Sequence, residues 1–370
     1  MRSCTVPRRP QHALWWTWLA LCSTPALAAE PGALPPALEQ CAQIGAAADR
    51  LACYDKFAGR APAPPSPGDA QKAAPAPTTL LAPKDAPEPA SAKPADDPSL
   101  LSKYWELDTK DKRGVFNLTG YRTNYVLPLH ATTRINRDPQ TPTQAAVSLP
   151  NYRRVEAKFQ LSLRTKVAQD VGLPGGDLWL AFTQQALWQV WNGADSKPFR
   201  NSDYEPEAIY VVPTGEGLRA LPFGWQWRYT QLALAHQSNG QSDPLSRSWN
   251  RVYLGAGFER GDWSFTTRIA HRLKEDLDSD NNPDLVGYRG RADFQLNWNA
   301  GPHTASLLYR TTLKDGHYGA LQFEWTYPVF KKQPNGLRWM VQAFGGYGET
   351  LTDYNFRQNS VGLGVSFQQF

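Results

Sequence analysis

Hydrophobic and polar residues alternate along most of the chain after about residue 114. Between residues 155 and 164, for example, Val, Ala, Phe, Leu and Leu alternate one by one with Glu, Lys, Gln, Ser and Arg. A period of two is typical of a β-strand with one apolar and one polar face. Twelve such segments start near residues 114, 155, 178, 204, 223, 249, 262, 287, 302, 317, 337 and 358. Turn-forming clusters at 174–177, 278–283 and 333–336 lie between them.

This pattern predicts an all-β fold, a twelve-stranded antiparallel transmembrane β-barrel over residues 101–370. Twelve is an even number, and many segments have about the ten residues that a tilted membrane strand needs. Three of the 14 Trp lie in residues 1–28, and the other eleven cluster near strand ends, as in aromatic girdles. The last segment ends on Phe370. A soluble β-barrel or sandwich is the alternative, because alternation alone does not say which face points outward.

The residues before the barrel fall into three parts. Three arginines, the apolar run 13–21 and the small residues 26–28 predict a signal peptide over 1–28. A membrane anchor is the alternative, but the apolar run is too short to span. Residues 61–100 hold 11 Pro and 11 Ala, which predicts a disordered linker.

Between these parts, residues 29–60 have the apolar spacing of a helix and contain Cys41 and Cys53. One straight helix would place the two sulfurs about 18 Å apart, whereas a bend near Gly45 would let them meet. In an oxidising envelope we expect a disulfide, with a reactive thiol or metal pair as the alternative. The segment resembles a small Cys-paired helical module of other envelope proteins, and that resemblance implies no activity.

Composition limits the classes of function. The 14 Trp, 15 Tyr and 15 Phe are too many for a chain that is disordered throughout. No run after the leader approaches 18 apolar residues, which excludes a helical membrane protein. Loss of the leader removes three arginines and no acid, so the formal charge falls from +5 to +2. Without a basic stripe, nucleic-acid binding is not expected.

Three polar residues lie on the apolar face of two neighbouring segments. His236 and Ser238 continue the apolar parity of one segment, and Asn250 continues that of the next. Polar groups on a lipid-facing wall are costly, and they persist where they pair or perform chemistry. The Cα atoms of His236 and Ser238 would lie about 7 Å apart. The histidine could then accept the serine proton, and the Asn250 amide oxygen could orient the imidazole. An ordinary polar loop is the alternative.

The run HQSNGQSDPLSRSWNR at 236–251 resembles the signature of the outer-membrane phospholipase A family. Similar motifs are YRTNY at 121–125, FQLSL at 159–163, KPFR at 197–200, YEP at 204–206, GGYGE at 345–349 and DYNF at 353–356. The resemblance spans 113–370 and leaves 29–112 uncovered. It implies a twelve-stranded, calcium-dependent barrel of the bacterial outer membrane. It also implies sn-1 and sn-2 hydrolysis of phospholipids and lysophospholipids, and activity as a homodimer.

The resemblance also implies roles for individual residues. Ser238 matches the nucleophile, His236 the general base and Asn250 the residue that orients it. The backbone N–H of Gly240 matches an oxyanion donor.

The calcium ligands implied by the resemblance are all oxygens, as Ca²⁺ prefers. They are the carbonyl of Gln241, the hydroxyl of Ser246 and the carbonyl of Ser196 from a second subunit. Gln241 stands where family members can carry Arg, a change that a carbonyl ligand tolerates.

A second calcium site of the family uses two acids. Asp243 matches one of them, but Asn281 stands in the place of the other. The second site is therefore in doubt unless Asp280 substitutes. A solvated loop is the alternative for Asp278, Asp280 and Asp284.

A dimer interface is implied on the outer wall. Gln184 is a lone amide on an apolar stripe, and a partner amide would best satisfy it. It matches the interface glutamine of the family, and Leu118, Leu161 and Leu163 match apolar interface contacts. Ordinary lipid-facing leucines are the alternative for these three.

The combined prediction is a calcium-dependent outer-membrane phospholipase with a serine nucleophile. A non-enzymatic barrel, either a channel or an assembly protein that carries a periplasmic interaction module, is the alternative. Charges expected on the inner face should pair and plug the barrel, which disfavours a channel. They are Glu156, Lys158, Arg164, Arg289, Arg291 and Asp293.

Overall fold

The computed structural model describes residues 40–41, 43–57, 99–276, 278–314, 318–334 and 336–367 of the 370. The chain divides into two units, residues 1–88 and 89–370. The predicted signal peptide, nearly all of the predicted linker and Phe370 lie outside the described residues. Within the described part, no helix is long and apolar enough to cross a membrane.

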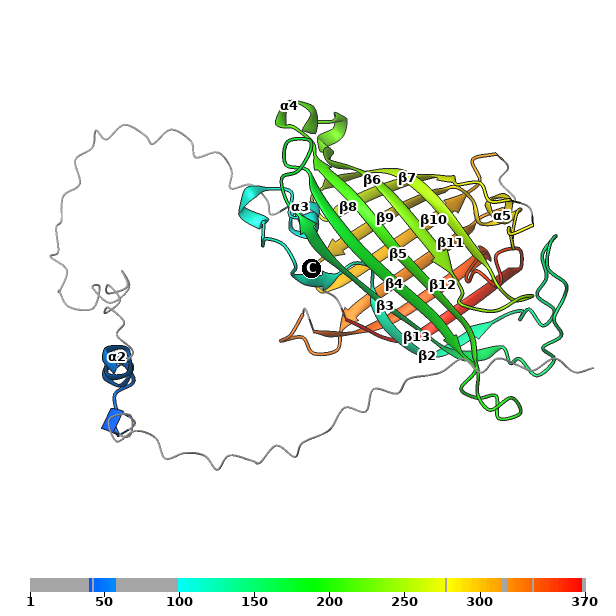
Figure 1. The fold of residues 1–370 in the computed structure, drawn as a ribbon, viewed down its shortest axis with the longest axis horizontal. Coiled ribbons are helices and arrows are strands. Elements are labelled where there is room, and N and C mark those ends of the chain that lie inside the picture. Colours follow the sequence, from blue (N-terminus) through cyan, green and yellow to red (C-terminus); the bar gives the residue numbers. More distant parts are fainter. Residues whose placement is uncertain are drawn as a thin grey trace, which may run out of the picture. The chain divides into compact units, whose positions relative to one another are not determined.

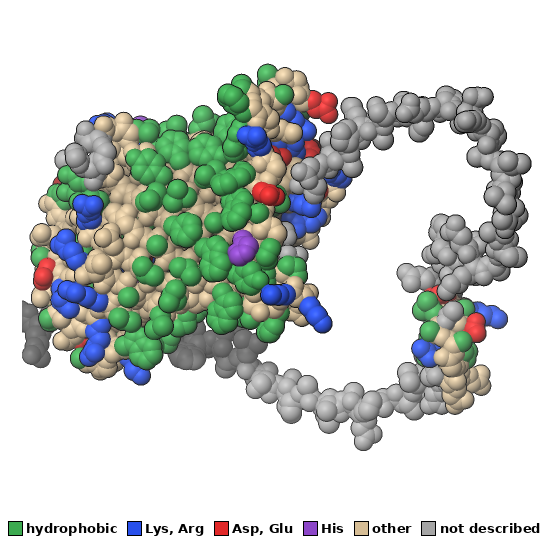
Figure 2. Space-filling view, turned by 180° about the vertical axis from the view of Figure 1, so that it is seen from behind, with side chains coloured by type: hydrophobic (Ala, Val, Ile, Leu, Met, Phe, Trp, Pro, Cys, Tyr) green, Lys and Arg blue, Asp and Glu red, His purple; other side chains and the backbone are tan. Residues whose placement is uncertain are grey.

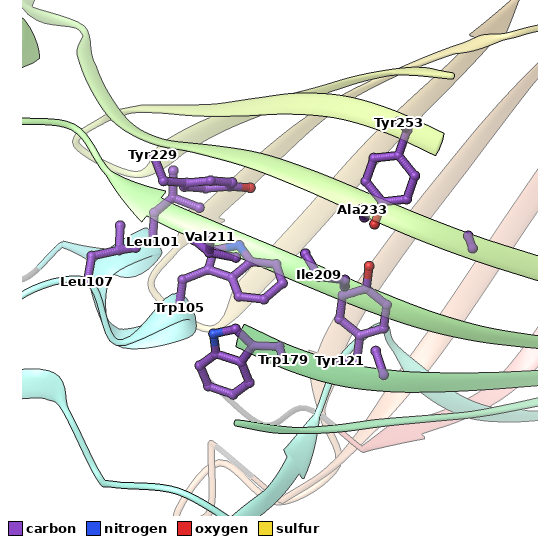
Figure 3. Packing of buried hydrophobic residues seen from close by; sticks show 12 residues of the cluster. Leu101, Trp105, Leu107, Tyr121, Trp179, Ile209, Val211, Tyr229, Ala233 and Tyr253 are labelled. Carbon is purple, nitrogen blue, oxygen red and sulfur yellow. The ribbon is translucent and has the colours of Figure 1, made fainter. Parts of the chain in front are cut away.

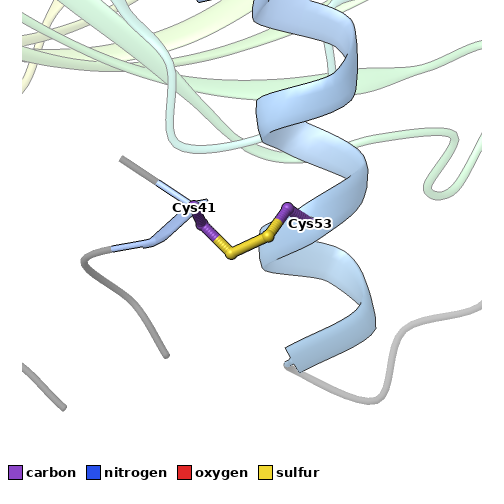
Figure 4. The surroundings of a disulfide bond; sticks show 2 residues. All are labelled: Cys41 and Cys53. Carbon is purple, nitrogen blue, oxygen red and sulfur yellow. A yellow bond between two sulfur atoms is a disulfide. The ribbon is translucent and has the colours of Figure 1, made fainter. Parts of the chain in front are cut away.

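The first unit contains the helix α2 (Ala47–Phe57) and a disulfide between Cys41 and Cys53 (Figure 4). The Cα atoms of the two cysteines are 5.6 Å apart. Ile44 and Gly45 are not helical, so the chain turns before α2 begins. This is the bend that the spacing of the cysteines requires.

The second unit is one antiparallel sheet that closes on itself (Figure 1). Its strands are β1 (Leu118–Gly120), β2 (Asn124–Thr132), β3 (Val155–Ala168), β4 (Asp177–Trp188), β5 (Phe199–Pro213), β6 (Gln226–Ser238), β7 (Ser248–Arg260), β8 (Trp263–Arg272), β9 (Ala292–Ala300), β10 (His303–Thr311), β11 (Ala320–Pro328), β12 (Leu337–Tyr347) and β13 (Arg357–Phe367). Short helices are α3 (Leu100–Trp105), η2 (Thr109–Asp111), α4 (Glu216–Arg219), η3 (Pro222–Gly224) and α5 (Leu285–Arg289).

The described strands form a twelve-stranded barrel because β1 and β2 are two parts of one broken strand. Both pair with β3, on the side opposite β4. Between them, the backbone N–H groups of Tyr121 and Arg122 donate to the carbonyl and hydroxyl oxygens of Ser162. The pairing of β13 with β2 then closes the barrel. The predicted twelve-stranded antiparallel fold is confirmed.

The apolar face of the barrel points outward. Leu232 and Leu254 are directly paired across β6 and β7, and they are 52% and 59% exposed. Green hydrophobic side chains cover the barrel wall in the space-filling view (Figure 2). The buried face instead carries charged residues such as Glu156 and Lys158. A soluble barrel would have the opposite arrangement, so the wall is that of a membrane barrel.

Most strands begin within a few residues of their predicted starts, but two begin five residues away. β5 begins at Phe199 rather than near 204, and β9 begins at Ala292 rather than near 287. In the second case α5 occupies residues 285–289. Arg289 therefore lies on a helix, where it is buried 3.9 Å from the Asp293 carboxylate. Arg291 precedes β9 and is exposed, so it is not among the buried charges of the interior.

Several charges on the inner face pair with one another, whereas Arg164 contacts aromatic rings. Arg200 binds the carboxylates of Glu156 at 2.9 Å and Asp353 at 2.5 Å. Lys158 binds Glu349 at 2.8 Å. These pairs fill the interior where a channel would need water.

The connections between the strands lie at the two ends of the barrel, which we call the turn end and the loop end. The turn end carries residues 169–176, 214–225, 261–262, 301–302 and 329–336. The loop end carries residues 133–154, 189–198, 239–247, 273–291 and 348–356, and the described residues of the connection between β10 and β11, 312–314 and 318–319.

The helix α3 closes the turn end of the barrel from within (Figure 3). Trp105 is 1% exposed and packs its ring against Trp179 and Tyr229, with centroids 5.7 and 5.8 Å away. The guanidinium of Arg164 lies 4.4 Å from the Trp105 ring centroid. The predicted linker, 61–100, overlaps α3 by one residue, Leu100.

Candidate active site

The two strands β6 and β7 bring His236, Ser238 and Asn250 together at the loop end. The register pairs His236 directly with Asn250, and Ser238 with Ser248. Directly opposed residues of antiparallel strands point to the same face. His236 and Asn250 therefore lie on the outward, apolar face, as the alternation predicts, and Ser238 is two residues further along it. All three are partly buried.

The histidine ring is held by a hydrogen bond between His236 Nδ1 and Asn250 Oδ1, 2.8 Å long. An amide oxygen only accepts, so Nδ1 carries the proton. The lone pair of Nε2 is then free to accept a proton from Ser238. The described residues show no hydrogen bond between His236 and Ser238, so the contact that the structure makes is that of the predicted base with the predicted orienting amide.

The connection 239–247 is folded around the side chain of Asn239. Its Oδ1 accepts from the backbone N–H of Arg247 at 2.9 Å, and its Nδ2 donates to the carbonyl of Leu245 at 2.8 Å. The same Nδ2 reaches Thr352 Oγ1 at 3.2 Å. Asn239 is buried. Its role in the loop could not be predicted from the sequence, because the alternation of strand residues does not extend into the loop. It fixes the shape of the loop that follows Ser238.

Gly240 occupies a conformation that favours glycine. Its φ is +60°, and a Cβ there would lie 3.1 Å from the ring of Tyr204. Among the described residues, the Gly240 N–H donates to no acceptor. It is therefore available to an oxygen that develops negative charge near Ser238.

The predicted ligands of the first calcium site lie in two loops. Gln241 and Ser246 belong to 239–247, and Ser196 belongs to 189–198, where its φ is +59°. Ser246 Oγ accepts a hydrogen bond from Asn281 Nδ2 at 2.9 Å. A hydroxyl has two lone pairs, so one remains for a cation. The carbonyl and hydroxyl oxygens fit the ligands that Ca²⁺ takes. Within the described residues, no three His, Cys, Asp or Glu side chains are grouped as for a metal.

The predicted second calcium site is bridged by an amide instead. Gln144 Nε2 donates to Asp243 Oδ1 at 3.3 Å and to the side-chain Oδ1 of Asn281 at 2.6 Å. Asp280 cannot replace the missing acid, because its Oδ1 accepts from Arg272 at 2.7 Å and from the Asn282 N–H. These residues do not fit a second cation.

The expectation of a solvated loop holds for only one of the three acids near this site. Asp278 is exposed, but Asp280 is 7% exposed, and Asp284 accepts a hydrogen bond from the hydroxyl of Tyr354. The solvated-loop expectation is therefore wrong for Asp280, which is buried by its pairing with Arg272.

The predicted dimer residues share one patch of the outer wall. Gln184 on β4 is directly opposite Leu161 on β3. Leu118 and Leu161 are exposed and Leu163 is partly buried. The side-chain amide of Gln184 has no hydrogen-bond partner among the described residues.

The chain is similar to known phospholipases A1. The family model for phospholipase A1 matches residues 101–367. A Neisseria meningitidis protein named as a candidate phospholipase A1 is 35% identical over 352 residues, which cover 89% of this chain and 90% of that one. The phospholipase A1 of Escherichia coli K12 is 33% identical, covering 68% of this chain and 81% of its own.

Solved structures are similar as well. The calcium-bound dimer of Salmonella typhi outer membrane phospholipase matches with a TM-score of 0.61 at 32% identity, over 70% of this chain and 94% of that one. An active-site mutant of outer membrane phospholipase A from Escherichia coli matches with a TM-score of 0.63 at 28% identity, over 73% and 99%.

Proposed function

This chain belongs to the phospholipase A1 family, and we propose that it hydrolyses the acyl esters of phospholipids and lysophospholipids in the bacterial outer membrane. The observation that carries the proposal is the 2.8 Å contact of His236 Nδ1 with Asn250 Oδ1, on the wall that faces lipid. We propose cleavage at both the sn-1 and sn-2 positions, as the resemblance of the run 236–251 implies.

The proposed reaction begins with proton transfer from Ser238 Oγ to His236 Nε2. The serine oxygen attacks the ester carbonyl carbon, and the carbonyl oxygen becomes an oxyanion that accepts from the Gly240 N–H. His236 then returns the proton to the departing glycerol oxygen, which leaves an acyl-serine. Water, deprotonated by the same nitrogen, releases the fatty acid and restores the serine. Asn250 holds the imidazole ring in one orientation and keeps the proton on Nδ1 throughout the reaction.

Calcium fits the first site by its donor chemistry. Gln241 would supply its carbonyl and Ser246 its hydroxyl, and the carbonyl of Ser196 would come from a second copy of the chain. A calcium ion held by these residues would supply positive charge that stabilises an oxyanion. We propose one calcium site of this kind, and none at Asp243, where the Gln144 amide donates to both Asp243 and Asn281.

A homodimer would complete the substrate site. A triad on the outer wall of one barrel has lipid on one side and no opposing protein surface, whereas a second barrel would form a cleft for the acyl chains. The unpaired amide of Gln184 on an apolar surface supports an interface there, since two such amides can satisfy one another. Leu118, Leu161 and Leu163 would supply apolar contacts around it.

A non-enzymatic barrel is the second candidate. The closed interior, with Trp105 in the turn end and buried ion pairs such as Arg200 with Glu156, disfavours a channel. An assembly protein would explain the disulfide-linked residues 41–53 better than a lipase does. We propose that these residues form a periplasmic module added to the enzyme.

The test is fatty-acid release from detergent-dispersed phosphatidylethanolamine, with excess Ca²⁺ or with EDTA, for the wild type and Ser238→Ala. We expect release that requires calcium and is lost in Ser238→Ala, while the variant keeps the far-ultraviolet circular dichroism of a folded barrel. Ser248→Ala is a matched control, because it removes a hydroxyl from the directly paired position on β7. Full activity in Ser238→Ala would exclude the mechanism. No release from the folded wild type would favour the non-enzymatic barrel.

A further inference from the structure

Both polar atoms of the Asn250 side-chain amide take part in hydrogen bonds. Its Oδ1 faces His236 Nδ1 at 2.8 Å, and its Nδ2 donates to Glu275 Oε1 at 3.1 Å. A carboxylate can only accept, so the amide nitrogen must face Glu275 and the amide oxygen must face the histidine. Glu275 thereby determines which way the Asn250 amide points.

The direction of this amide decides the tautomer of His236. With the oxygen toward the ring, Nδ1 carries the proton and Nε2 can accept one. With the amide reversed, its N–H group would donate to Nδ1, and the proton would move to Nε2. That tautomer cannot accept a proton from Ser238. An aspartate in place of Asn250 would have no such reversed orientation, because a carboxylate accepts at both oxygens. A neutral asparagine therefore needs a second group to fix its direction.

Glu275 is itself held by the end of β8. The backbone N–H of Leu273 donates to the carbonyl of Asn250 at 2.8 Å, which continues the pairing of β7 with β8 past Arg272. The guanidinium of Arg272 lies 4.0 Å from Glu275 Oε2. The glutamate side chain is 20% exposed, so it is mostly enclosed next to the amide that it binds.

We propose that Glu275 is a positioning residue of this active site, which acts through Asn250 to keep His236 in the tautomer that accepts the serine proton. It lies in the connection 273–291, outside the run 236–251 on which the triad was predicted. The inference rests on the proposed function and deepens it, because it adds a fourth member to the hydrogen-bonded set.

The test compares Glu275→Ala in two backgrounds, the natural Asn250 and Asn250→Asp. In the natural background we expect kcat to fall about tenfold, the effect of one hydrogen bond to a charged group, with KM unchanged. In the Asn250→Asp background the carboxylate fixes the tautomer alone, and Glu275 is a like charge beside it. Glu275→Ala should there leave kcat unchanged or raise it. Lys274→Ala, an exposed neighbour in the same connection, is the matched control.

The outcomes separate a positioning role from a structural one. If Glu275 only fixed the loop, its loss would lower kcat in both backgrounds, and that result would overturn the proposal. A kcat within twofold of wild type in the natural background would overturn it too. Glu275→Gln keeps the shape of the side chain and serves if Glu275→Ala does not fold. Its amide can accept or donate, so its kcat should lie between those of the wild type and Glu275→Ala; a wild-type value would overturn the proposal. Failure of the proposed function is distinguishable, because wild type would then release no fatty acid.

Discussion

Substitution of Asn281 by aspartate should create a second cation site. In the natural chain Gln144 Nε2 lies 3.3 Å from an oxygen of Asp243 and 2.6 Å from the Asn281 oxygen, so the two oxygens are less than about 6 Å apart. In Asn281→Asp both would belong to carboxylates. Ser246 Oγ loses a donor, but it can turn its own proton toward the new acid. The geometry would change little while the negative charge rises.

The cost and the gain can be estimated from these distances. Two charges about 6 Å apart repel by about 0.7 kcal/mol in water and by about 3 kcal/mol at an effective dielectric of 20. Asp243 is exposed, so a value of about 1 kcal/mol applies. Calcium between the two carboxylates removes this repulsion, and at 100 times its dissociation constant it stabilises the fold by about 2.7 kcal/mol. Asn281→Asp should therefore be less stable than wild type in EDTA and more stable in excess calcium.

The assays are thermal unfolding of the detergent-solubilised barrel with EDTA or Ca²⁺, and calorimetric titration with Ca²⁺. We expect the variant to bind one more calcium ion per chain than wild type. The double variant with Asp243→Asn carries one carboxylate at the site again and should lose the extra ion. The reasoning is refuted if Asn281→Asp binds no additional calcium. It is also refuted if Asp243→Asn alone removes a calcium ion from the natural chain.

Three further substitutions test other parts of the molecule. Asn250→Ala removes the hydrogen bond to His236 and should lower kcat about tenfold at constant KM; a loss as complete as that of Ser238→Ala would contradict an orienting role. Trp105→Ala empties a site that is 1% exposed and should lower the free energy of unfolding by about 3–5 kcal/mol in urea titrations; a change below about 1 kcal/mol would show that α3 packs loosely. Gln184→Leu should weaken calcium-induced dimerisation measured by cross-linking, and unaltered cross-linking would place the interface elsewhere.

The fold, and the position of His236 and Asn250 on one face of the barrel, could be predicted because both depend on the parity of strand residues. Parity put His236 and Asn250 on one face, and the register pairs them across β6 and β7. No such rule applies where two loops meet. Gln144 and Asn281 are 137 residues apart, and nothing in the spacing of either one indicates the other. Glu275 lies beyond the end of its strand, where alternation carries no information.

The positions of the residues in the outward site depend on polar residues inside the barrel. The alternating pattern predicted only that this interior is charged. Asn239, next to Ser238, donates to Thr352 Oγ1, which in turn donates to Asn201 Oδ1 at 2.6 Å. Asn201 donates to Asp203 at 2.7 Å, and Asp203 accepts the backbone N–H next to Thr352 at 2.9 Å. The loop that carries Gly240 is thus fixed by hydrogen bonds from inside the barrel, although the proposed substrate would approach from outside. The barrel wall is a single layer of strands with fluid lipid on its outer side. The inner network is buried and fully paired along this chain of contacts, and it can therefore keep the proposed site rigid from inside the barrel.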